Sequence, residues 1–173
     1  MNGSQDATAA LDETDLALLE QVEADFDVSL ETIADELGLS KSAVHYRLNK
    51  LEANGVIRGV TADVDPLALG LELTAVTDVM VTHETGYSEA IGESLVALDG
   101  VEHVYYTMGD VDFVVVSRVQ SRDQLNDLID RIVAVEGVNE TASKFVLDEF
   151  DDHAVSSNLT PAARNAILEP ADR

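Results

Sequence analysis

The sequence of 173 residues contains no cysteine, no tryptophan and only three prolines. The absence of cysteine excludes disulfide bonds, thiolate metal ligands and thiol nucleophiles. No run of 18 apolar residues occurs, so no segment is predicted to cross a membrane as a helix. Residues 1–10 are polar and acidic and lack the apolar core of a signal peptide. With 46% hydrophobic residues, the composition favours a globular protein, and we expect it in the cytoplasm.

Basic residues are also scarce. Ten Lys and Arg stand against 34 Asp and Glu, which gives a net charge of −24. The acids are dispersed along the whole chain and do not form a single acidic tail. Dispersed acid with little lysine is typical of a halophilic protein, because concentrated salt screens the repulsion between the carboxylates.

One segment, residues 37–60, departs from this acidic background. It holds Lys41, Arg47, Lys50 and Arg58 against the single acid Glu52, a local charge of +3, so the rest of the chain sums to −27. A cationic island on an acidic protein indicates a surface that approaches a negatively charged partner.

The same segment has the pattern of an amphipathic helix. Ser40 is a good N-cap, and Val44, Leu48 and Leu51 follow at i, i+4 and i+7. Two more helices are predicted before it, over 11–25 and over 30–37. Three helices in this arrangement favour a helix-turn-helix, although a solvated helix of an ordinary bundle has the same pattern. The opposite face of the predicted recognition helix carries Ser42, His45, Tyr46, Asn49 and Lys50, with Arg47 at its flank.

Beyond this region the pattern changes to strands. A β-rich return is predicted over 56–64, and Asp65-Pro66 breaks the chain near a domain boundary. Strands are then predicted over 73–82, 101–107, 113–119 and 138–147, and helices over 88–98 and after Ser121. The order βαββαβ predicts a ferredoxin-like domain, so the fold class is α+β.

The predicted sheet has helices on one face only. Val114, Val116, Tyr105 or Val79 could lie on the open face, and an apolar face of this kind favours a homodimer. In the tail, 151–173, Thr160-Pro161 can begin a short helix, for which docking and disorder are both open.

Taken together, these features resemble the Lrp/AsnC (feast/famine) family of transcriptional regulators, in a haloarchaeal version. The resemblance implies a flexible N-terminus (1–10), a helix-turn-helix domain (11–60), a strand linker (61–72), a ferredoxin-like effector-binding domain (73–150) and a C-terminal tail. It also implies double-stranded DNA as a partner, a homodimer that can assemble into tetramers or octamers, and an amino-acid effector. The matching segments are Leu11 to Asp15, Ile33-Ala34, Leu37 to Ser40, Val44, Arg47-Leu48, Leu51-Glu52, Gly55 to Gly59, Gly109 to Asp112 and Gly137-Val138.

Two sets of site residues carry over from the resemblance. A solvated surface pair is the alternative for His45 and Tyr46, and an ordinary hairpin is the alternative for the predicted effector loop. The predicted DNA contacts are Ser40, Lys41, Ser42, His45, Tyr46, Arg47, Lys50 and Arg58. The predicted effector contacts are Thr107, Gly109, Asp110 and Asp112 in one turn, with Asn139 and Thr141 in the last strand.

No enzyme motif was found, and we predict no catalytic residue, metal or cofactor apart from the effector. The acidic run 148–152 is interpreted as a solvated surface rather than a cation site. Two alternatives to a regulator are a tetrapyrrole decarboxylase that shares this architecture and a co-regulator without DNA binding. The retained cationic helix argues against the second.

Overall fold

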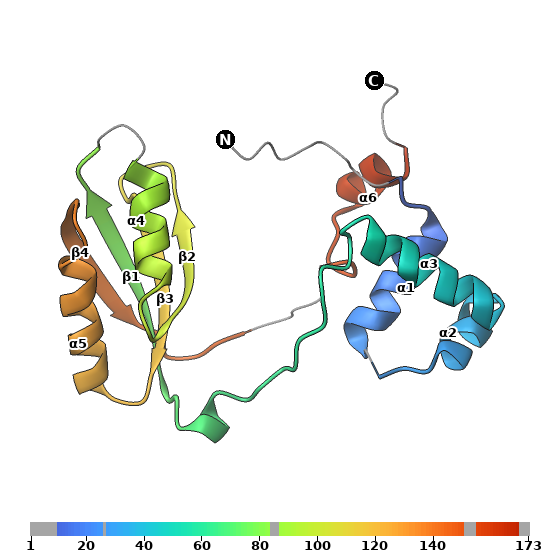
Figure 1. The fold of residues 1–173 in the computed structure, drawn as a ribbon, viewed down its shortest axis with the longest axis horizontal. Helices are drawn as coiled ribbons and strands as arrows, with labels where there is room; N and C mark the ends of the chain where they lie inside the picture. Colours follow the sequence, from blue (N-terminus) through green and yellow to red (C-terminus); the bar gives the residue numbers. More distant parts are fainter. Residues whose placement is uncertain (1–9, 26, 84–86, 151–154, 170–173) are drawn as a thin grey trace. The chain divides into compact units, whose positions relative to one another are not determined.

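The computed structural model describes residues 10–25, 27–83, 87–150 and 155–169. The chain forms two compact units, which we call the helical unit (1–62 and 151–173) and the sheet unit (63–150). The helical unit contains α1 (Glu13–Ala24), α2 (Leu30–Leu37), α3 (Lys41–Ala53) and α6 (Pro161–Leu168). The sheet unit contains η1 (Leu67–Leu69), β1 (Leu73–Val81), α4 (Tyr87–Val96), β2 (Val101–Tyr106), β3 (Phe113–Val119), α5 (Arg122–Val133) and β4 (Val138–Phe145) (Figure 1).

The three predicted N-terminal helices are confirmed. Ser29 Oγ accepts a hydrogen bond from the Thr32 N–H at 3.0 Å, and Ser40 Oγ accepts one from the Ala43 N–H at 3.2 Å. Each serine therefore satisfies a backbone donor that the first helical turn leaves free. The helices pack around a core of Leu18, Ile33, Ala34, Val44 and Leu51.

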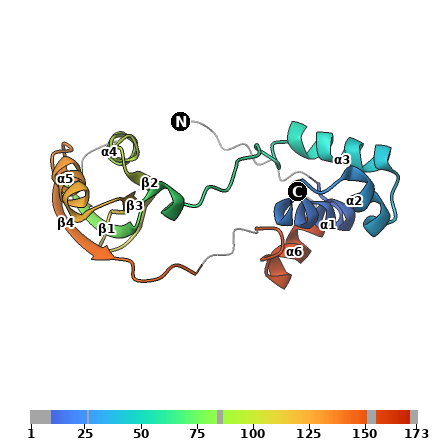
Figure 2. The same cartoon turned by 90° about the horizontal axis from the view of Figure 1, so that it is seen from below.

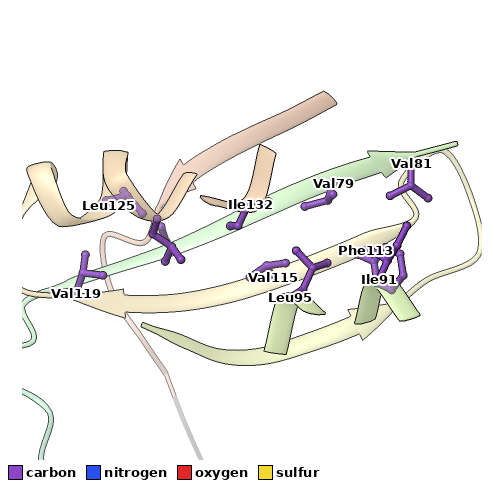
Figure 3. Close-up of a cluster of buried hydrophobic side chains, with 11 residues drawn as sticks. Val79, Val81, Ile91, Leu95, Phe113, Val115, Val119, Leu125 and Ile132 are labelled. Atoms are coloured by element: carbon purple, nitrogen blue, oxygen red, sulfur yellow. The ribbon is translucent and has the colours of Figure 1, made fainter. Parts of the chain in front are cut away.

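The sheet unit has the predicted ferredoxin-like topology. Its strand order is β2-β3-β1-β4, and all neighbouring strands are antiparallel. Both α4 and α5 lie on the same side of the sheet (Figure 2). The core between the sheet and these helices includes Val79, Leu95, Phe113, Val115 and Ile132 (Figure 3).

Alternation along the strands defines the second, open face of the sheet. Val114 and Val116 are half-buried and alternate with buried residues of β3, and Tyr105 remains 54% exposed. The expectation that Val79 could lie on this face is wrong, because Val79 belongs to the inward row of β1 and is 0% exposed. A period of two separates the faces of a strand but does not show which face the helices cover.

No strand forms over 56–72, so the predicted β-rich return and the strand linker are also wrong. The N–H groups of Val56 and Ile57 donate to the Leu51 carbonyl at 2.9 and 3.2 Å, which folds the chain back onto the end of α3. Both side chains then pack against the helical core. Farther on, Val60 and Val64 are exposed, and no described strand lies alongside to complete a ladder.

The C-terminal tail forms the predicted short helix, with Thr160 as its N-cap and Pro161 in its first turn. It belongs to the helical unit. Arg164 contacts Glu13 at 2.8 Å and Glu20 at 2.9 Å, and the Ser156 N–H donates to the Glu23 carboxylate at 2.7 Å. The tail therefore docks on α1 of its own chain.

Candidate DNA-binding helix and effector loop

One stripe of α3 faces away from the helical core. Val44 and Leu51 are buried on the inner side. The outer stripe has the spacing i, i+3, i+4 and i+7, and its side chains can donate and accept hydrogen bonds, as the recognition of base edges requires. Tyr46 is 70% exposed, and Asn49 Nδ2 lies 3.2 Å from His45 Nδ1. The stripe consists of Ser42, His45, Tyr46 and Asn49.

Cations and a helix N-terminus flank this stripe. Lys41, Lys50 and Arg58 are exposed, and none of them forms an ion pair within the described residues. The N-terminal turn of α3 carries Ser40 and Ser42, whose hydroxyl oxygens lie 3.1 Å apart. A helix N-terminus attracts anions through its free N–H groups and its dipole. The cations and the helix N-terminus are therefore suited to contact the phosphate backbones on either side of a DNA groove.

Arg47 differs from the other predicted DNA contacts, because its side chain already has partners inside the chain. Its Nη1 lies 2.8 Å from Asp12 Oδ2 and 2.5 Å from Asp15 Oδ1, and its side chain is only 26% exposed. The sequence spacing already indicates this partly buried position, although Arg47 was predicted at the flank of the outer face. Val44, Arg47, Leu48 and Leu51 fall at i, i+3, i+4 and i+7, so Arg47 occupies the inner stripe of α3.

The predicted effector residues lie at one end of the sheet. The turn after β2, the end of β1 and the start of β4 meet there, as the pairs Val79 with Phe113 and Val81 with Val138 show. Gly109 and Asp110 are exposed in the turn. Thr141 is half-buried and pairs with Val79.

Several of these effector candidates make hydrogen bonds within the sheet unit. Asp112 Oδ2 accepts from the Val81 N–H at 2.9 Å, and Asp112 Oδ1 lies 2.6 Å from His83 Nε2. The Val81 hydrogen bond lowers the pKa of Asp112 below its ordinary value, and His83 acts in the same direction. Asn139 Oδ1 accepts from the Thr82 hydroxyl at 3.0 Å.

The Thr107 N–H donates to the Asp112 carbonyl at 2.8 Å, and the Thr107 hydroxyl donates to the Val111 carbonyl. Thr107 and Asp112 thus hold the turn in shape. Asp110 is the exposed carboxylate of the set.

Comparison with known proteins decides the family. Residues 74–155 match the Lrp/AsnC ligand binding domain, and residues 11–58 match a winged helix-turn-helix DNA-binding domain. The regulator FL11 of Pyrococcus furiosus is 34% identical over 137 residues, which cover 79% of this chain and 89% of FL11. The chain belongs to the Lrp/AsnC family.

Other Lrp/AsnC proteins agree with this assignment. The regulator LysM of Sulfurisphaera tokodaii is 35% identical over 80% of this chain and 96% of its own length. A feast or famine regulatory protein from M. tuberculosis, solved in complex with L-methionine, superposes with a TM-score of 0.76 at 32% identity, over 83% of this chain and 97% of the other.

Two further observations concern the helices of this Lrp/AsnC protein. The helix α6 lies beyond the residues that match the ligand binding domain. Also, no helix among the described residues is long and apolar enough to span a bilayer.

Proposed function

We propose that this Lrp/AsnC protein is a DNA-binding transcriptional regulator whose α3 enters the major groove. The observation that carries the proposal is the exposed polar stripe of α3 on a chain with a net charge of −24. Three cations flank the stripe, and none of them has an ion-pair partner in the part of the chain that the structure describes. In this arrangement Lys41, Lys50 and Arg58 hold phosphates, while His45 and Asn49 read bases. The relatives above are regulators by name, so the tetrapyrrole decarboxylase is not proposed.

The experiment selects duplexes from a random library with the full-length protein and footprints the enriched sequence. Asn49→Ala should then lose about 1–3 kcal/mol of discrimination at one base position. Asn165→Ala is the matched control, since Asn165 is an exposed asparagine of α6 away from the α3 stripe. If no sequence is enriched, or if Asn49→Ala keeps the wild-type preference, α3 does not read bases.

The finer part of the proposal is an amino-acid effector at the end of the sheet unit. Support comes from the convergence of the turn after β2 with the ends of β1 and β4, and from the relative solved with L-methionine. The exposed Asp110 carboxylate is suited to an ammonium group, and Asn139 can complete the site. Calorimetric titration with L-methionine and other amino acids tests this part. The surface variant Asp130→Asn is the control. If Asp110→Asn binds the amino acid with the same affinity as this control, Asp110 does not contact the effector.

We also propose that the regulator is a homodimer formed through the open sheet face, with tetramers or octamers as further assemblies. Val114, Val116 and Tyr105 supply an apolar surface that the helices of the same sheet unit do not cover. Val116→Asp should produce monomers in analytical ultracentrifugation. Val133→Asp, at a 51% exposed position of α5, should not. A monomeric wild-type protein would contradict the dimer.

A further inference from the structure

The guanidinium of Arg47 joins the middle of α3 to the first turn of α1. Its Nη1 lies 3.0 and 2.8 Å from the two carboxylate oxygens of Asp12 and 2.5 Å from Asp15 Oδ1. Asp12 is the N-cap of α1, and Asp15 is the N3 residue of the same capping box. Both carboxylates therefore belong to one rigid helix start, which the Arg47 side chain holds from α3.

The buried carboxylate makes this contact costly to break. The Asp15 side chain is only 2% exposed, and Arg47 is its cationic partner among the described residues. An unpaired charge in such a position is strongly unfavourable, so Asp15 retains Arg47. If Arg47 moved to a phosphate, Asp15 would lose its counterion.

The contact favours the charged forms of Arg47 and Asp12. The hydrogen bonds to Asp12 and Asp15 raise the pKa of Arg47 above its ordinary value. Burial raises the pKa of Asp12, but the hydrogen bonds from Arg47 and from the N–H groups of Asp15 and Thr14, together with the Arg47 charge, leave the pKa below its ordinary value. One cation faces two anions, so the cluster adds no positive charge to the DNA-binding face.

We propose that Arg47 is a positioning residue, which fixes α3 against the start of α1 through Asp12 and Asp15 and so sets the orientation in which the α3 stripe meets the bases. This inference rests on the proposed DNA-binding function. It replaces a direct DNA contact at Arg47 with an indirect role, and it gives Asp15 a part in sequence recognition although Asp15 is buried.

The test compares specific with non-specific DNA binding in the full-length protein. The probes are the duplex selected from the random library and a scrambled duplex of equal length. Arg47→Met keeps much of the aliphatic packing of the side chain, and Asp15→Asn removes the buried charge without touching the exposed face. Each variant should lower the ratio of specific to non-specific affinity by about tenfold, and the double variant should lose little more than either single one. Non-specific binding should stay unchanged.

Lys50→Met is the matched control, since Lys50 is exposed on the same helix and has no ion-pair partner within the described residues. It should weaken both affinities alike, as a phosphate contact does. Two results would overturn the inference: Arg47→Met behaves like Lys50→Met, or Asp15→Asn leaves the ratio unchanged.

Circular dichroism confirms that each variant remains folded, and Asp12→Asn serves as a milder variant if Asp15→Asn unfolds the helical unit. Denaturant midpoints of the single and double variants give a readout without DNA. If the midpoint shift of the double variant equals the sum of the shifts of the two single variants, Arg47 and Asp15 do not act together and the inference is also overturned. A wild-type protein that binds neither duplex refutes the proposed function itself, which is a distinguishable result.

Discussion

The salt dependence of DNA affinity tests how many cations the structure leaves free for phosphates. Lys41, Lys50 and Arg58 are exposed and unpaired within the described residues, whereas Arg47 is held by carboxylates. Each neutralised phosphate contributes a slope of about −0.9 to a plot of log affinity against log salt concentration. Three contacts therefore predict about −2.7 per bound subunit, and a fourth contact from Arg47 would predict about −3.6.

These slopes correspond to large and separable losses of affinity. A tenfold rise in KCl should weaken binding about 500-fold per subunit with three contacts and about 4,000-fold with four. A dimer doubles the slope, to about −5.4 for three contacts per subunit. Phosphate contacts alone are therefore weak in concentrated salt, and the proposed base contacts of the α3 stripe would then have to supply most of the affinity.

Fluorescence anisotropy with a labelled duplex measures the slope over a tenfold range of KCl. Replacing Lys41, Lys50 or Arg58 by Met should each reduce the slope by about 0.9 per subunit. Lys144→Met is the control, because Lys144 pairs with Asp78 at 2.5 Å in the sheet unit and should leave the slope unchanged. A wild-type slope near −3.6 per subunit would refute the assignment of Arg47 to α1. A slope near zero would show that α3 does not touch phosphates.

Three further predictions concern the two units. Gly137 has φ of 93°, and a Cβ there would lie 2.9 Å from Ile91 Cδ1. Gly137→Ala should therefore lower the free energy of unfolding in urea by about 2–4 kcal/mol, and adding Ile91→Val should recover the part that is due to the clash. An unaltered urea midpoint for Gly137→Ala would contradict the clash. The hydrogen bond from the Val81 N–H depresses the pKa of Asp112 in the folded protein. The ionised Asp112 therefore stabilises the fold fully above its unfolded-state pKa, and this stabilisation is lost as pH falls through the lower folded-state pKa. Unfolding free energy should therefore decline below about pH 4, and Asp112→Asn should remove that part of the decline; an identical acid profile in the variant would exclude the assignment. Arg164→Gln should change global stability little but speed amide hydrogen exchange in α6, and unchanged exchange there would show that the ion pairs of Arg164 do not hold the tail.

Much of the fold could be predicted because helix ends and strands leave local signals. Ser29, Ser40 and Thr160 mark helix starts by accepting from N–H groups three residues later in the chain. Gly100 and Gly137 mark the two helix-to-strand junctions of the sheet unit, with φ of 92° and 93°. In each case the deciding interactions lie within a few residues of the marker.

The predictions are wrong where the local structure depends on residues that are distant in the sequence. Valine-rich residues 56–64 have strand propensity, but the Leu51 carbonyl and the helical core capture their first two residues, and no described strand pairs with the rest. Val79 alternates correctly along β1, yet only the packing of α4 and α5 shows which face is inward. The Asp112 carboxylate remains a predicted effector contact, and only the structure shows that it accepts from the Val81 N–H and lies 2.6 Å from His83 Nε2.

By itself, the sequence determined the order of the elements, the cationic character of α3 and the family, since each of these depends on residue types and short spacings. The tertiary structure decided which polar side chains remain free to act. Arg47 meets Asp15 and Asp12 across 32 and 35 positions of the chain. Contacts at such separations exist only after the helices have packed, and they give Arg47, a predicted DNA contact, two carboxylate partners at the start of α1.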